Sequence, residues 1–274
     1  MPRTDDFRAL HRTGAPLVLP NAWDFASAAA LIDVGFTAIG TTSLGVAAAH
    51  GLPDGHGAAR AETLALTRRL ARLPCLLTVD VEAGFSEDPD EVVSFVADIA
   101  AAGAVGVNLE DGRADGTLAA VDRQRDLIAA VKARVPELFL NARTDTHWLT
   151  GEPDLADTLA RVEAYRDAGA DGVFVPGLAD ENDIRAVVST VDVPVNVLCQ
   201  PGRYTVRQLA DLGVRRVSCG SLLFRAALLA AVGTARAVAG DEPVPAGVPS
   251  YTETTDLIAR FSCWSAGGTD LIPA

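Results

Sequence analysis

One pattern recurs along this chain: a helical stretch ends in a glycine, and a short apolar run follows it at once. The clearest copies have Gly35, Gly103, Gly169 and Gly213, followed by FTAI, AVGV, ADGVFV and VRRV. Glycine is the usual residue where a helix ends in the left-handed conformation. A short run without strict polar alternation is typical of a strand buried on both faces. The repeat therefore predicts parallel strands, each preceded by a helix.

The spacing of these copies predicts the number of strands. The intervals from Gly35 to Gly103 and from Gly103 to Gly169 each hold about two βα units. We expect eight strands, at 17–20, 36–40, 75–80, 105–109, 138–142, 172–175, 193–198 and 214–218. Eight such units in about 240 residues suit the α/β class and one (β/α)8 TIM barrel. A doubly wound sheet is the alternative, but residues 19–24 read LPNAWD, where that fold would have a Gly-x-Gly-x-x-Gly turn.

The sequence changes character after Gly240. Residues 241–249 hold three prolines and two acids, which is typical of a linker, and an amphipathic segment follows around 251–264. We expect a barrel over residues 1–240 and a linker with a C-terminal helical extension over 241–274. Such an extension needs an apolar surface to cover, so we also expect a homodimer or homotetramer.

Composition excludes several classes of protein. With 23 Lys+Arg against 36 Asp+Glu, the net charge is −13, which argues against a nucleic-acid partner. Gly, Asp or Arg interrupts the apolar runs before the ~20 residues of a membrane helix, and residues 1–6 lack the layout of a secretory signal. None of the 4 cysteines forms a Cys-x-x-Cys pair, so reduced thiols are expected. We expect a cytoplasmic protein without a membrane partner.

Polar side chains follow seven of the eight predicted strands. In a barrel of parallel strands, functional groups lie at the carboxyl ends. Only the strand at 172–175 ends without polar residues, in VPG. The polar residues at the other ends are Asn21, Asp24, Thr41, Thr42, Ser43, Asp80, Glu82, Asn108, Glu110, Asp111, Asn141, Arg143, Asp145, Asn196, Cys199, Gln200, Ser218 and Ser221.

The acids among these residues suggest a metal site. Asp80, Glu82 and Glu110 would converge with Asp54, and such a cluster is costly unless a cation relieves the repulsion. Mg²⁺ suits oxygen ligands that no His or Cys accompanies, and Mn²⁺ is possible. The alternative is that Asp80 and Glu82 cap the next helix.

Arg143 is the expected cationic partner of a ligand. Its guanidinium could hold a carboxylate with two hydrogen bonds or stabilise an enolate oxygen, or it could form a structural ion pair with Glu110 or Asp145. Residues 41–45 (TTSLG) supply hydroxyl and N–H groups suited to a carboxylate. His147 is a further candidate as a proton carrier.

Several motifs carry a family resemblance. They are residues 20–24 (PNAWD), 51–55 (GLPDG), 80–85 (DVEAGF), 107–111 (VNLED), 141–145 (NARTD) and 194–197 (PVNV). The chain resembles the isocitrate lyase/phosphoenolpyruvate mutase superfamily from residue 20 to about residue 227. The resemblance implies a (β/α)8 barrel whose C-terminal helix is swapped between subunits, Mg²⁺ at the strand ends, and 2-oxo acids or their enolates as ligands.

The resemblance also implies roles for individual residues. Ser43 and the backbone of Leu44 and Gly45 would bind the ligand carboxylate and keto oxygen. The remaining assignments are Asp54, Asp80, Glu82 and Glu110 for the metal and its waters, and Trp23, Asp80, Arg143 and Asn196 for the ligand. Asp54, Glu110 and Arg143 would be the catalytic residues.

Two departures from the family bear on the reaction. The lyases carry a Lys-Lys/Arg-Cys-Gly-His loop after the Glu-Asp pair, but residues 112–117 here read GRADGT. The Lys-Lys-Asn segment of the phosphonate mutases and hydrolases is also missing. Isocitrate lyase, methylisocitrate lyase and phosphoenolpyruvate mutase are therefore each disfavoured, and Glu82 stands where those enzymes have a second Asp.

We expect a Mg²⁺-dependent, carbon–carbon lyase-like enzyme that acts on a small 2-oxo acid or 2-hydroxy carboxylate through an enolate. Asp54 or a metal-bound water would carry the proton in place of the missing cysteine. One alternative is a phosphonopyruvate-type P–C bond hydrolase or mutase, for which only Arg143, Arg113 and Arg203 could supply cations. The other is a 2-oxo acid binding protein without catalysis.

Overall fold

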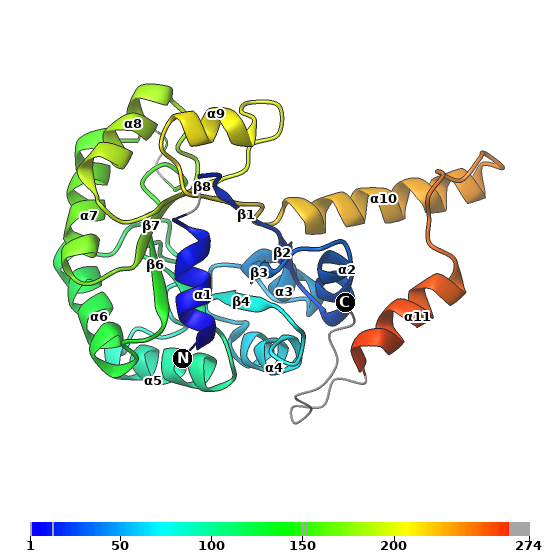
Figure 1. Cartoon of the computed structure of the whole chain (residues 1–274), viewed down its shortest axis with the longest axis horizontal. Coiled ribbons are helices and arrows are strands. Elements are labelled where there is room, and N and C mark those ends of the chain that lie inside the picture. Colours follow the sequence, from blue (N-terminus) through cyan, green and yellow to red (C-terminus); the bar gives the residue numbers. More distant parts are fainter. Residues whose placement is uncertain (1, 13, 150, 152, 263–274) are drawn as a thin grey trace.

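The computed structural model describes residues 2–12, 14–149, 151 and 153–262. Its centre is a nine-stranded parallel sheet in the order β1-β9-β8-β7-β6-β5-β4-β3-β2. The strands at the two ends of this row, β1 (Leu17–Leu19) and β2 (Asn21–Ala22), are consecutive in the chain, so the sheet curls into a nearly closed barrel (Figure 1). The predicted (β/α)8 TIM barrel is confirmed. The extra strand, β2, lies just beyond the first predicted strand, and Pro20, which has no N–H for the ladder, separates it from β1.

The other strands lie close to their predicted positions. They are β3 (Ala38–Thr41), β4 (Leu76–Asp80), β5 (Gly106–Glu110), β6 (Phe139–Arg143), β7 (Gly172–Val175), β8 (Val195–Leu198) and β9 (Arg216–Ser218). The register pairs Asp80 with Asn108 and Glu110 with Arg143 across neighbouring strands. The pairing of neighbouring strands therefore places these four residues side by side.

Helices cover the outside of the barrel (Figure 1). They are α2 (Phe25–Asp33), α3 (Ser43–Ala49), α4 (Arg60–Leu70), α5 (Pro89–Ala101), α6 (Val121–Arg134), α7 (Leu155–Asp167), α8 (Glu181–Thr190) and α9 (Val206–Asp211). Aspartates cap several of them: Asp24, Asp88, Asp154 and Asp180 each accept a hydrogen bond from a first-turn N–H. The first helix, α1 (Pro2–Leu10), packs Phe7 against Phe139 at the amino end of the barrel.

The glycines of the repeated pattern behave as predicted. Gly35, Gly103, Gly169 and Gly213 have φ values of 97°, 109°, 100° and 92°. L-residues with a side chain rarely adopt this region, which explains why glycine stands at each helix end. The local pattern thus determined where each helix turns into the next strand.

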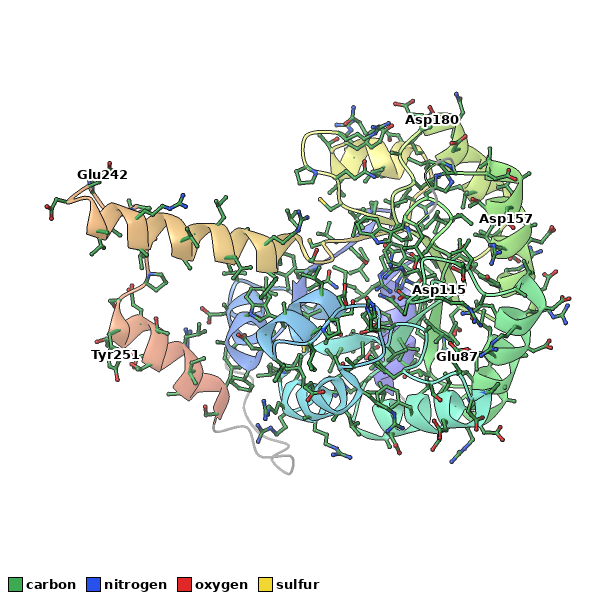
Figure 2. The ribbon with its side chains drawn as sticks, turned by 180° about the vertical axis from the view of Figure 1, so that it is seen from behind. Glu87, Asp115, Asp157, Asp180, Glu242 and Tyr251 are labelled. Carbon is green, nitrogen blue, oxygen red and sulfur yellow. The ribbon has the colours of Figure 1, made fainter. Side chains whose placement is uncertain are left out.

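The C-terminal part leaves the barrel. Helix α10 (Leu222–Ala239) projects from the barrel, and α11 (Tyr251–Ser262) turns back toward α2 (Figure 1), where Arg260 pairs with Asp33 at 2.8 Å. Figure 2 shows Glu242 and Tyr251 on this extension, away from the barrel. The predicted amphipathic segment runs to residue 264, and its last two residues lie outside the described part. The division at residue 240 and the swapping of helices stay predictions.

Helix α10 differs from the other described helices in composition. By length and composition alone it could cross a membrane, with a mean hydropathy of 1.6 over 18 residues, of which 11% are buried. A single helix of this kind is weak evidence, and it carries Arg225 and Arg236. The expected absence of a membrane partner therefore stays a prediction.

Candidate active site

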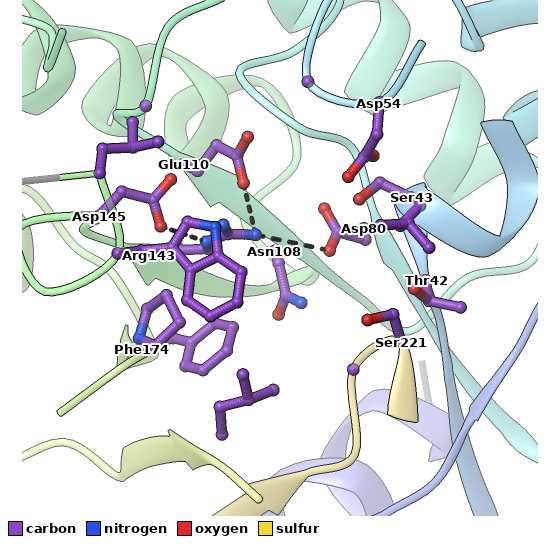
Figure 3. Close-up of a pocket in the computed structure, with 18 of the residues that line it drawn as sticks. Thr42, Ser43, Asp54, Asp80, Asn108, Glu110, Arg143, Asp145, Phe174 and Ser221 are labelled. Atoms are coloured by element: carbon purple, nitrogen blue, oxygen red, sulfur yellow. Dashed lines mark hydrogen bonds and ion pairs between the residues drawn. The ribbon is translucent and has the colours of Figure 1, made fainter. Parts of the chain in front are cut away.

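The carboxyl ends of the strands surround a cavity of about 280 Å³ (Figure 3). Of the residues predicted for the site, those that line it are Ser43, Leu44, Asp54, Asp80, Glu110 and Arg143. Trp23, Gly45, Glu82 and Asn196 are not among the lining residues, and neither is His147. The cavity lies where the sequence predicted the functional groups.

Arg143 is the centre of a buried ion-pair cluster. Its Nη1 lies 2.6 Å from Glu110 Oε2 and 3.9 Å from Asp80 Oδ2, and its Nε lies 2.7 Å from Asp145 Oδ1 (Figure 3). The β5–β6 register accounts for the first pair, because it sets Glu110 beside Arg143. None of these contacts uses Nη2. The structural ion pair and a role in ligand binding are therefore compatible.

The cluster carries more negative charge than Arg143 balances. Burial raises the pKa of Asp80, of Glu110 and of Asp145, and the nearby guanidinium only partly opposes this. Burial alone would lower the pKa of Arg143, but the three carboxylates raise it overall. Carboxylates that share a buried site in this way favour binding of a further cation or a proton.

Asp54 and Glu82 come from outside the row of strand ends. Asp54 is exposed in the turn after α3 and points toward Asp80 (Figure 3). Glu82 has a φ of 50°, and its Oε2 accepts a hydrogen bond from the Gly57 N–H at 3.0 Å. Burial is the main reason that its pKa rises to about 7. Glu82 thus supports the loop that carries Asp54.

Two observations bear on a metal ion. The buried Oε1 of Glu82 has no hydrogen-bond partner among the described residues. Among the described residues, no group of three or more His, Cys, Asp or Glu side chains is arranged so that it could hold a metal ion. The site therefore offers individual carboxylates and no closed cage of protein ligands.

Gly45, Trp23 and Asn196 were predicted for the site and do not line the cavity, but each has close contacts of its own. A Cβ on Gly45 would stand 2.7 Å from Thr42 Cγ2 and 2.9 Å from Trp23 Cβ, so only glycine fits there. Trp23 itself packs edge-to-face on Phe224. The Asn196 amide donates to Ser218 Oγ at 3.0 Å, and Ser218 lines the cavity.

Sequence reasoning missed Arg216, which lies inside the barrel and is 1% exposed. Its Nη2 donates to Asn108 Oδ1 and its Nε to Ser218 Oγ, each at 3.2 Å. Its Nη1 has no partner among the described residues, and burial lowers its pKa to about 9. Residues 215–218 (RRVS) do not indicate which of the two neighbouring arginines faces into the barrel.

Asp111 was noted at the strand end without a role. It is 0% exposed and accepts hydrogen bonds from Arg161 Nη1 at 3.0 Å and from the Tyr165 hydroxyl at 2.7 Å. It also accepts one from the Asp145 N–H at 2.9 Å. Asp111 therefore links α7 to the loop that begins beside Arg143.

The chain matches a family model and several known proteins. Residues 7–239 match the family model described as phosphoenolpyruvate phosphomutase. The chain is 47% identical over 251 residues to an uncharacterized protein of Mycobacterium tuberculosis (strain ATCC 25618 / H37Rv), covering 90% of this chain and 93% of that one. It is 27% identical over 215 residues to an oxaloacetate decarboxylase of Ectopseudomonas mendocina, covering 74% and 72%.

Solved structures share the same fold. A crystal structure of a putative lyase/mutase from Burkholderia cenocepacia has a TM-score of 0.85 and 37% identity, covering 95% of this chain and 96% of that one. A phosphonopyruvate hydrolase solved with oxalate and Mg²⁺ has a TM-score of 0.83 at 24% identity, with coverages of 95% and 96%. The second comparison shows likeness of fold alone.

Proposed function

Because the chain belongs to the isocitrate lyase/phosphoenolpyruvate mutase superfamily, whose members are lyases and mutases, we propose that it is a Mg²⁺-dependent enzyme for small 2-oxo acids or 2-hydroxy carboxylates. It makes or breaks a carbon–carbon bond next to the oxo group through an enolate. Relatives named 2-methylisocitrate lyase and oxaloacetate decarboxylase support this substrate class. The observation that carries the proposal is the buried Arg143 between three carboxylates in the cavity.

The donor chemistry fits Mg²⁺. All candidate ligands are oxygens, and Mg²⁺ commonly takes one or two protein carboxylates and keeps several waters. Asp80 would bind the ion, while Asp54, Glu82 and Glu110 would hold its waters. The same oxygen ligands would accept Mn²⁺. When bound, the ion supplies a Lewis acid for the carboxylate and oxo oxygens of a substrate.

The residues of the chain would divide the remaining work. Breaking the carbon–carbon bond leaves its electron pair on the carbon next to the oxo group, and the oxo oxygen takes up negative charge as an enolate. The other carbon of the bond leaves as carbon dioxide or as a carbonyl compound. Arg143 can donate its Nη2 hydrogens to that oxygen. Ser43 and the Leu44–Gly45 backbone bind the carboxylate end. Asp54 carries the proton that the enolate carbon takes up when the product forms.

A binding experiment tests this site. Calorimetry with oxalate in the presence of Mg²⁺ should give tight binding to the wild type and at least a 100-fold loss in Asp80→Asn. Asp98→Asn, an exposed acid on α5, is the matched control and should bind as the wild type does. An unchanged affinity in Asp80→Asn would show that the carboxylate cluster is not the ligand site.

A thermal-shift screen then identifies the substrate. About twenty 2-oxo and 2-hydroxy acids, each with and without Mg²⁺, should include one that raises the melting temperature only with the metal, because a ligand selective for the folded state stabilises it. Product analysis with that compound separates turnover from binding alone. Tight binding with no loss of the ligand over hours would favour a 2-oxo acid binding protein.

Phosphorus–carbon chemistry has less support from the cavity. A phosphonate carries more negative charge than a carboxylate, and in the described part of the chain the Arg and Lys residues lining the cavity are Arg143 and Arg113. Arg203, the third expected cation, does not line it and donates to the Ala179 carbonyl at 2.9 Å. The carbon–carbon reaction is therefore the function that we propose.

The extension supports a homodimer or homotetramer with exchanged C-terminal helices. The side chains of Leu228, Leu229 and Val232 on α10 are exposed, and apolar patches of this kind mark association surfaces. Light scattering should give a dimer or tetramer for the full chain. A monomer at every concentration tested would contradict this assembly. We keep a cytoplasmic location as a prediction.

A further inference from the structure

The cavity has two chemically different sides. Asp54, Asp80 and Glu110 come from the β3–β5 part of the barrel. The side formed by β6, β7, β8 and the loops after them consists mainly of large apolar residues, which we call the apolar wall: Trp148, Leu149, Phe174, Pro176 and Leu198. Figure 3 shows Phe174 on the opposite side of the cavity from Asp54 and Ser43.

Local contacts fix Trp148 and Leu149 of the apolar wall. The backbone N–H groups of Trp148 and Leu149 both donate to the Asp145 carbonyl at 2.9 Å, so the loop is tied to the ion-pair cluster. The Leu149 side chain packs over Gly112, where a Cβ would stand 3.1 Å from its Cδ1. The wall is therefore built into the fold beside Arg143.

Part of this wall is left uncovered at the cavity mouth. Trp148 is 56% exposed and Leu149 is 37% exposed. Large apolar side chains that line a cavity and remain open to solvent are typical of surfaces that contact a ligand. Their chemistry therefore indicates the part of the ligand that faces them.

The two arginines in the described cavity lining already face acids. Arg143 is already paired with Glu110 and Asp145. Arg113, the other arginine in the described cavity lining, has its Nη2 3.5 Å from Glu87 Oε2. A second carboxylate against the apolar wall would lose water and would have to compete with these acids for a cation, which disfavours it.

We propose that the substrate is a 2-oxo monocarboxylate whose substituent is apolar. The carbon next to its oxo group loses a proton to Asp54 and bonds to the carbonyl carbon of a second substrate, whose oxygen takes up the proton. Its carboxylate and oxo group face Ser43, Asp80 and Arg143, and its hydrocarbon part packs on Trp148, Leu149 and Leu198. This inference rests on the proposed function, because it takes the carboxylate cluster as the site of the 2-oxo group. Each buried methylene should tighten binding about fourfold.

A pair of ligands with the same shape tests the proposal. In 4-methyl-2-oxopentanoate two methyl groups replace the two oxygens of the second carboxylate of oxaloacetate. With Mg²⁺ present and oxalate as the displaced ligand, 4-methyl-2-oxopentanoate should bind at least tenfold tighter than oxaloacetate. The series pyruvate, 2-oxobutanoate and 2-oxopentanoate should tighten about fourfold per step.

Variants connect this preference to the wall. Trp148→Ala should reduce the ratio of the oxaloacetate dissociation constant to that of 4-methyl-2-oxopentanoate about tenfold. Leu198→Ala has the same expected effect and is the second variant if Trp148→Ala does not fold. Val34→Ala removes an exposed apolar side chain from the end of α2 and should leave the ratio unchanged.

The outcomes separate the two proposals. If oxalate fails to bind with Mg²⁺, the proposed function falls and this inference falls with it. If oxalate binds but oxaloacetate competes as well as 4-methyl-2-oxopentanoate, the apolar substrate is refuted while the proposed function stands. A ratio that neither wall variant changes would also refute the role of the wall.

Discussion

Removing the Asp111 carboxylate should destabilise the protein strongly, although it does not line the cavity. The carboxylate is fully buried and accepts hydrogen bonds from Arg161, Tyr165 and the Asp145 N–H. In Asp111→Ala these three donors lose their acceptor in a place that water does not reach. Removing one partner of a buried ion pair typically costs about 3 to 5 kcal/mol.

Other contacts of Arg161 narrow this range. Its Nε keeps Asp157 Oδ2 at 2.8 Å, and its Nη1 keeps the Ala119 carbonyl at 2.9 Å. The guanidinium is therefore not left without a partner, and the lower part of the range applies. We expect the free energy of unfolding to fall by about 3 to 4 kcal/mol in Asp111→Ala. Tyr165→Phe removes a single donor and should cost about 1 to 2 kcal/mol.

Urea unfolding followed by far-UV circular dichroism measures these losses. Asp126→Ala, which removes an exposed acid paired with its neighbour Arg125, is the control and should leave the midpoint unchanged within error. If Asp111→Ala unfolds at the same urea concentration as this control, the contacts of Asp111 do not stabilise the fold as expected. An order in which Tyr165→Phe costs more than Asp111→Ala would also contradict this expectation.

Two further predictions concern stability. Because burial raises the pKa of Glu82 to about 7 from 4.5, the folded metal-free protein holds a proton that the unfolded chain releases, so its stability should fall as pH rises from about 4.5 to 7. Urea midpoints should decrease over this pH range, and the decrease should be smaller in Glu82→Gln. Midpoints that rise with pH would contradict this prediction. Gly84→Ala should cost about 2 to 4 kcal/mol in urea unfolding, because Gly84 has a φ of 96° and a Cβ there would stand 2.3 Å from Val92 Cγ1. Gly35→Ala, with a φ of 97° and open space around the Cβ, should cost only about 1 to 2 kcal/mol, and equal losses would count against the packing argument.

The sequence predicted the barrel because the relevant signals are local. A glycine at a helix end and the apolar run after it report on a few neighbouring residues, and the structure has the strand of each copy where the pattern predicted it. Polar residues directly after those runs had to lie at the same end of a parallel sheet. The sequence could therefore predict that Asp80, Glu110 and Arg143 lie at one end of the barrel, where they line the same cavity.

Residues whose role depends on orientation could not be assigned in this way. Arg216 begins β9 and Arg215 directly precedes it, yet Arg216 is fully buried while Arg215 is half-buried. Glu82 lies two residues after Asp80, but its positive φ turns it toward Gly57. Alternation along a strand says that successive side chains face opposite ways, and it does not say which of them faces inward.

The sequence by itself determined the order of strands and helices and the end of the barrel at which the acids gather. Only the tertiary structure assembled Trp148, Phe174 and Leu198 into one wall opposite those acids. Trp148 lies in the loop after β6, where no periodic pattern marks an apolar residue, and Phe174 and Leu198 come from β7 and β8. Their strands are neighbours in the sheet, and their position opposite the acids follows from closure of the sheet, which depends on contacts between residues far apart in the chain.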